Sequence, residues 1–108
     1  MSIDLRRRVT REQFTEQVHS VFTLRVGDVA LQAELVEVAP RGDAPGQEQF
    51  SLIFRVAPDT PAVQLLWEAE HPALGTQALL LVPVQRDAAG LYLEAAFNRL
   101  ITAAGEEA

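Results

Sequence analysis

The stretch ALLLVPV, residues 78–84, is the most apolar run of the chain and the feature that most restricts its fold. The run lies between Gly75 and Arg86, so it is too short for a membrane-spanning helix and has the length of a β-strand. A half-buried strand would alternate apolar and polar residues, whereas both faces of this one are apolar. We therefore expect the core of a sheet or small barrel to cover one face. A helix, a loop or another chain should cover the second face.

Length, charge and cysteine content limit the classes of protein to consider. The chain has 108 residues, no cysteine and a formal net charge of −6. This length predicts one domain with a modest core. The lack of cysteine excludes disulfides and thiolate zinc sites and fits a reducing compartment, so a cytoplasmic location is predicted. The acidic charge disfavours nucleic acid and anionic membranes as partners, and no apolar segment typical of a signal peptide follows the N-terminal arginines.

One helix is predicted near the N-terminus, from about Arg11 to Ser20. Thr10 and Gln13 have the spacing of a capping box, and Phe14 and Val18 follow at helical spacing. The apolar stripe of such a helix needs a sheet to lie on.

Six β-strands are predicted after the helix, because apolar and polar residues alternate along five segments and the apolar run at 78–84 has the length of a sixth strand. The segments are residues 22–26, 29–38, 50–56, 65–70, 78–84 and 91–97. Gly27 should take the positive φ of the first hairpin turn. The alternation changes phase at Leu35–Val36, which a β-bulge would correct, and Pro83 predicts an edge or a bulge because it cannot donate to a ladder.

Together these elements predict a mainly β fold. We expect an antiparallel meander of about six strands, bent into a small barrel or half-barrel, with the helix plugging one end or face. The pattern leaves open whether the sheet is a closed barrel or an open sandwich, and a helix over 91–104 is the alternative for the last element. The domain should span residues 10–101 with its helix at 11–20, between a basic leader at 1–9 and a frayed tail at 102–108.

Four segments resemble a small bacterial domain family of uncharacterised function. Members of that family look like FSLxF, QGxYxxxHPxLG, LFLVPV and YEAxFN, and the resemblance covers about residues 12–98 in the same order. The structural motif residues expected from it are Phe50, Leu52, Phe54, His71, Pro72, Leu74, Gly75, Phe97 and Asn98. The chain departs from the family where Leu65 replaces a glycine, Trp67 and Leu93 replace tyrosines, and His19 replaces a frequent glycine. The resemblance implies a structural or accessory role linked to phage-tail-like gene clusters.

The residue patterns predict no catalytic residue, no metal site and no cofactor. Glu68 and Glu70 share one face of a strand, but His71 points to the opposite face, so the three do not converge on a metal. Two histidines without a triad partner do not make a hydrolase. We expect His71 to form a hydrogen bond within the HPxLG turn, and His19 to interact with the dipole at the helix end.

Two classes of function remain. The favoured one is a non-catalytic interaction or structural module that binds a protein partner or itself. The reason is that a strand with two apolar faces needs a second surface to cover it. The alternative is a small barrel that binds an apolar ligand, although six strands would be filled by side chains; an enzyme ranks third. Candidate partner residues are Arg6, Arg7, Arg8, Arg11, Trp67, Pro83 and Tyr92, of which the basic run also fits a solvated tail.

Overall fold

The computed structural model describes residues 9–42 and 46–100, which form six β-strands and the short helix α1 (Arg11–Thr15). The strands are β1 (Val21–Val26), β2 (Val29–Pro40), β3 (Gln47–Val56), β4 (Leu65–His71), β5 (Gly75–Asp87) and β6 (Gly90–Leu100). The predicted mainly β, antiparallel fold is confirmed, and residues 91–100 are strand, so the helical alternative for them is wrong. The predicted tail lies outside the described residues, as does the leader except for Val9, which is buried.

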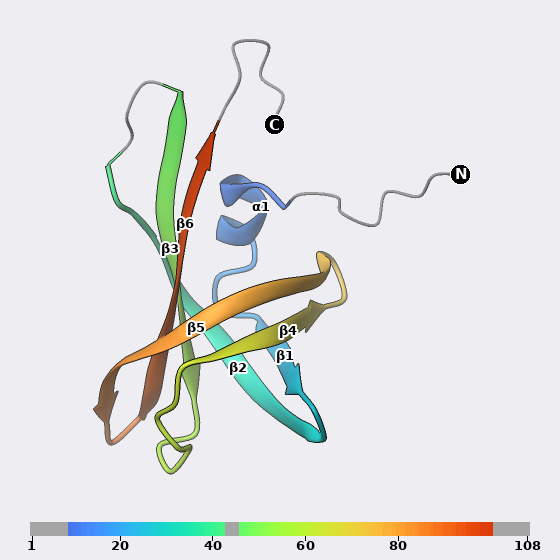
Figure 1. The fold of residues 1–108 in the computed structure, drawn as a ribbon, viewed down its shortest axis with the longest axis vertical. Helices are drawn as coiled ribbons and strands as arrows, with labels where there is room; N and C mark the ends of the chain where they lie inside the picture. The colour runs from blue at the N-terminus through green and yellow to red at the C-terminus, as the bar shows by residue number, and fades with distance from the viewer. Residues whose placement is uncertain (1–8, 43–45, 101–108) are drawn as a thin grey trace.

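The strands close into a barrel with the order β1-β2-β3-β6-β5-β4, and every neighbouring pair is antiparallel. Figure 1 shows β3 and β6 side by side along most of their length, with β5 crossing them. The β3–β6 ladder runs from Gln47 opposite Leu100 to Val56 opposite Leu91. The β1–β4 ladder joins only Thr23–Arg25 to Glu68–Glu70. The ring is therefore closed, but one of its seams is short.

Both predicted irregularities are present. The ladder between β2 and β3 shifts register between Leu35 and Glu37, where the alternation changes phase. The ladder between β5 and β6 shifts between Pro83 and Gln85. Gly27, in the β1–β2 turn, has the expected positive φ, 55°. The bulge of β2 keeps Leu35 and Val38 on the core side of the barrel, whereas the residues of β5 beyond its bulge are exposed.

Helix α1 begins as predicted but ends earlier. The Thr10 side chain accepts a hydrogen bond from the Gln13 N–H, and the Gln13 side chain accepts one from the Thr10 N–H, which completes the capping box. From Gln17 onward the local backbone bonds span three residues, such as Ser20 N–H to Gln17 O, so the chain tightens into turns. The helix therefore covers residues 11–15 instead of 11–20.

His19 lies beyond the last helical turn, in a left-handed backbone conformation with φ of 79°. Its N–H donates to the Leu35 carbonyl, and this bond directs the chain into β1. The ring Nδ1 lies 3.2 Å from Glu34 Oε2. The interpretation of His19 as a partner of the helix dipole is wrong, because that dipole acts only within the last turn.

The core fills the inside of the barrel with side chains from every strand and from α1. Its largest fully buried side chains are Phe14, Phe22, Phe50, Phe54, Leu24, Leu35, Leu52, Leu81, Leu91 and Val9. Phe14 reaches from α1 to Phe50 and Phe97, with ring centroids 6.3 and 5.8 Å away, and Phe50 stacks on Phe97 at 4.7 Å. The helix thus plugs the part of the barrel where β3 and β6 pair.

The most apolar run is covered on one face only. Leu79 and Leu81 are buried, whereas Leu80 and Val84 are each 50% exposed. Within the described residues neither a helix nor a loop covers the second face, and its cover by another chain stays a prediction. The reason is that α1 lies against β2 instead, and β5 pairs with β6 only from Val82 onward. None of the helical residues that the structure describes forms a segment with the length and apolarity needed to cross a membrane.

Candidate functional site

Two exposed leucines lie opposite each other on the outer surface of β4 and β5. Leu66 and Leu80 are partners in the β4–β5 ladder and are 61% and 50% exposed. The next outward pair toward the hairpin turn is Glu68 with Ala78, followed by Glu70 with Thr76. The outer face of this hairpin thus changes from polar near its turn to apolar at its open end. We call Leu66, Leu80 and Ala78 the β4–β5 patch.

The leucine pair is exposed because the sheet is only two strands wide there. β1 pairs with β4 opposite Glu68–Glu70 and ends at Val26, so it gives Leu66 no neighbour. On the other side, β6 pairs with β5 no further than Val82 and gives Leu80 none. Cross-strand neighbours normally cover such outward side chains, so their absence leaves the patch in water.

A hollow of about 360 Å³ adjoins the patch, between the β1–β2 turn and β4. Arg25, Leu66, Glu68 and Ala78 are among the residues that line it. Arg25 Nε donates to Glu70 Oε2 at 2.9 Å, and Glu68 has no ion pair among the described residues. One guanidinium therefore stands among two carboxylates, which leaves a net negative charge beside an apolar surface.

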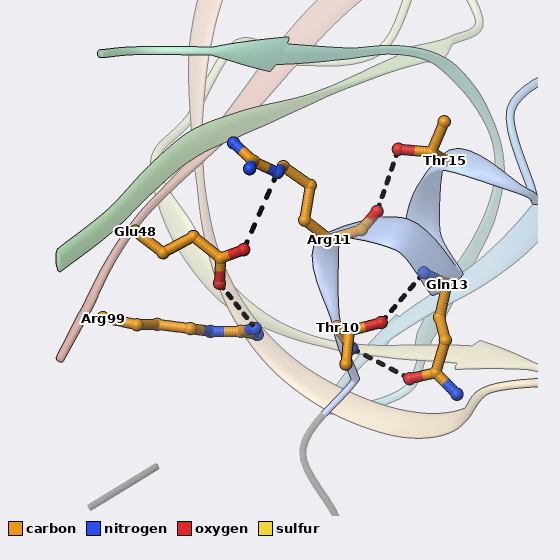
Figure 2. Close-up of polar contacts among 6 residues, drawn as sticks. All are labelled: Thr10, Arg11, Gln13, Thr15, Glu48 and Arg99. Atoms are coloured by element: carbon orange, nitrogen blue, oxygen red, sulfur yellow. Dashed lines mark hydrogen bonds and ion pairs between the residues drawn. The ribbon is translucent and has the colours of Figure 1, made fainter. Parts of the chain in front are cut away.

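A second polar cluster lies beside α1, where Glu48 of β3 is placed between two arginines (Figure 2). Arg11 Nε is 3.6 Å from Glu48 Oε2, and Arg99 Nη1 is 3.9 Å from Glu48 Oε1. The Arg99 guanidinium also lies over Phe97, 4.7 Å from the ring centroid. The side chains of Arg99 and Glu48 are only 9% and 14% exposed. This cluster ties α1 to β3 and β6 and offers little surface to a ligand.

His71 is held by hydrogen bonds of a kind that general-base catalysis does not use. Its Nδ1 accepts from the Ala73 N–H at 3.0 Å, so the ring proton is on Nε2. Nε2 lies 3.0 Å from Ser20 Oγ, which itself donates to the Gln17 carbonyl at 2.6 Å. His71 thus donates to the serine instead of taking its proton, the reverse of a serine–histidine nucleophile. Burial lowers the pKa of His71, which favours the neutral ring.

Acidic residues and His71 do not converge. Glu68 and Glu70 face outward and His71 faces the core, in agreement with the alternation along β4. Among residues 9–42 and 46–100, no group of three or more His, Asp or Glu side chains is arranged to hold a metal ion.

The predicted partner residues do not form one surface. Arg6, Arg7 and Arg8 lie outside the described residues. Arg11 belongs to α1, whereas Pro83 and Tyr92 belong to the β5–β6 hairpin, at the opposite end of the barrel in Figure 1.

Trp67 is 5% exposed and packs in the core, and it also lines the hollow beside the β4–β5 patch, so its role in partner binding stays a prediction. Its burial follows from the alternation of β4, in which Trp67, Ala69 and His71 all point inward. The polar indole N–H suggested a rim position, but the large apolar area of the ring decides its place.

Most of the motif residues expected from the family resemblance lie in the core or in a turn. Phe50, Leu52, Phe54 and Leu74 are in the core, Phe97 packs against it, His71, Pro72 and Gly75 form the β4–β5 turn, and Asn98 is exposed on β6. Sequence reasoning missed Leu66 and Leu80 as site residues. The alternation of residues 65–70 places Leu66 on the outward face, whereas both faces of the run that contains Leu80 are apolar and give no such signal.

Comparison with known proteins gives a family but no characterised relative. Residues 9–97 match the family described as a domain of unknown function, DUF6916. No curated protein and no solved structure matches the chain.

Proposed function

The chain belongs to the DUF6916 family, and we propose that it is a non-catalytic interaction module that docks onto a protein assembly through the β4–β5 patch. The observation that carries this proposal is the exposed pair Leu66 and Leu80 on a sheet only two strands wide. Contiguous apolar surface rimmed by polar residues is typical of protein–protein contact sites. The hollow beside Ala78 gives a partner side chain a place to enter.

The interior of the barrel supports this function over the binding of an apolar ligand. Phe22 and Phe54 are packed edge to face inside the ring, with centroids 5.2 Å apart, and both are fully buried. Small barrels are filled in this way by their own side chains. The direction of the hydrogen bond from His71 Nε2 to Ser20 Oγ also supports a non-catalytic role.

We place the module in the cytoplasm, as an accessory of a phage-tail-like or other multiprotein assembly. Support for the compartment is the absence of cysteine from the chain. Support for the assembly is the resemblance of the FSLxF, HPxLG and LVPV segments to their family. Self-association is the second form that such a module takes, and the net charge of −6 weighs against it.

Capture from extracts of the native host tests the proposal. The bait is the full chain, as wild type and as the variants Leu66→Lys and Val21→Lys; Val21 is a half-exposed valine on β1 outside the patch. We expect quantitative mass spectrometry to find a protein retained by wild type and Val21→Lys and lost with Leu66→Lys. Thermal melts of the three baits show that each is folded. Equal capture by all three would show that the patch is not the docking surface.

A further inference from the structure

One edge of β5 has no neighbouring strand over half its length. Residues 75–81 pair with β4, whereas pairing with β6 begins at Val82. Figure 1 shows β5 diverging from β6, which continues beside β3. Backbone hydrogen bonds outside the ladders do not reach residues 75–81 anywhere in the described chain. Because alternate residues of a strand direct their N–H and C=O groups to opposite sides, this edge presents a row of unpaired donors and acceptors.

This edge also lacks the features that keep natural edge strands from pairing. Its sequence, GTQALLL, has no charged residue and no proline. The bulge of β5 lies beyond it, between Pro83 and Gln85. Lysines, prolines, bulges and short length are the usual protection of an exposed edge. Other segments also lack a ladder on one side, such as residues 65–67 of β4 on the β1 side and residues 95–100 of β6 on the β5 side. The β4 segment has only three residues, and the β6 segment carries the charged Arg99.

We infer that an extended segment of a partner protein adds to this edge of β5 as a further strand. Main-chain hydrogen bonds to residues 75–81 would supply affinity, and side chains beside Ala78 and Leu80 would supply selectivity. The inference rests on the proposed function and specifies how the partner binds.

Charge and size select the occupant. A second copy would bring another net charge of −6 to the contact. An edge of seven residues, about 23 Å long, offers backbone groups to one added strand and therefore suits a linear segment. An uncharged or basic segment of another protein also avoids the charge repulsion. The occupant is therefore a linear apolar segment, uncharged or basic, without proline at its centre.

Selection from a displayed library of random linear peptides tests this inference on the full chain. The targets are wild type, Ala78→Lys and the control Ala30→Lys, which changes an exposed alanine on β2. Ala78→Lys should fold, because Ala78 is exposed and its cross-strand partner is Glu68. We expect enriched peptides to be apolar and poor in acidic residues, and to bind Ala78→Lys about tenfold or more weakly than the other two.

Amide hydrogen exchange then separates strand addition from other contacts. With an enriched peptide bound, alternate amides of residues 75–81 should become protected. Shifts at the Leu66 and Leu80 methyl groups without amide protection would overturn strand addition and leave the proposed function standing. A library without enrichment would also overturn it, and Leu66-dependent capture from the host would then still support the proposed function. A dimer of the free chain that Ala78→Lys dissociates, measured by light scattering, would identify a second copy and overturn the inference.

Discussion

The imidazole of His71 lies over the ring of Phe22, with the two ring centroids 4.5 Å apart. The same imidazole accepts a hydrogen bond from the Ala73 N–H and lies within hydrogen-bond distance of Ser20 Oγ. These contacts join the β4–β5 turn to the segment that leads into β1. They require a neutral ring, because a proton on Nδ1 would face the Ala73 N–H, and burial lowers the pKa of His71 in the same direction.

Stability should therefore fall on acidification. The native pKa of His71 lies below its ordinary value of about 6.5, so below that pH the unfolded chain takes up the proton more readily than the native chain. The free energy of unfolding keeps this contribution above about pH 6.5 and loses it as the pH falls through the native pKa. Denaturant melts of wild type and His71→Ala at a series of pH values measure it. At neutral pH the variant should be less stable than wild type, and its free energy of unfolding should change less with pH. Equal pH dependence of the two proteins would contradict a neutral, buried His71.

Phe54→Ala should lower the free energy of unfolding by about 3–5 kcal/mol, because it empties a fully buried site in the ring of strands. Ile53→Ala is the matched control, since Ile53 is the neighbouring outward residue and only half-buried. Urea melts compare the two. A loss below about 1 kcal/mol for Phe54→Ala would mean that the faces of β3 are reversed.

Leu81→Ala and Leu80→Ala should differ sharply although the two leucines are adjacent. Leu81 is fully buried, so its truncation should cost about 2–5 kcal/mol, whereas truncation of half-exposed Leu80 should stay within about 1 kcal/mol. Chemical denaturation measures both. Similar large losses would mean that part of the same chain covers Leu80.

Glu48→Gln should destabilise the fold by about 1–3 kcal/mol, because it removes the carboxylate that Arg11 and Arg99 share in a mostly covered position. Glu37→Gln removes an exposed carboxylate of β2 and serves as the control, with an expected change within about 0.5 kcal/mol. Thermal unfolding at matched ionic strength compares them. A Glu48 variant as stable as wild type would show that the cluster does not hold α1.

His19→Gly should raise stability by about 0.5–1 kcal/mol, because glycine takes the positive φ at this position without steric cost. His19→Ala, which keeps the unfavourable conformation and loses the contact with Glu34, should not stabilise. Glu34 keeps its ion pair with Arg55 in both variants. Equal melting temperatures for the two variants would indicate that the backbone conformation carries no strain.

Local features of the fold could be predicted because each depends on residues close in sequence. The phase change at Leu35–Val36 and the missing donor of Pro83 located both bulges. The resemblance to the family also marked position 19, where a frequent glycine corresponds to the positive φ of His19. Helix length was overestimated because Val18 continues the apolar spacing after the backbone has already left the helix.

Exposure of Leu80 could not be predicted from the sequence. Alternation tells which side chains share a face of a strand, but it does not tell which strands lie on either side. Leu80 is exposed because β6 pairs with β3 along its whole length and leaves β5 at Val82. That arrangement depends on contacts between segments far apart in sequence.

The short seam between β1 and β4 has a kinetic consequence. Thr23 lies opposite Glu70, and Gln47 lies opposite Leu100, so ring closure must wait for distant parts of the chain to find each other. Chains dominated by such non-local pairings refold in roughly milliseconds to seconds. Until β1 pairs with β4, the barrel stays open. The unprotected edge of β5 can then pair with strands of other unfolded chains as well as with its proposed partner segment.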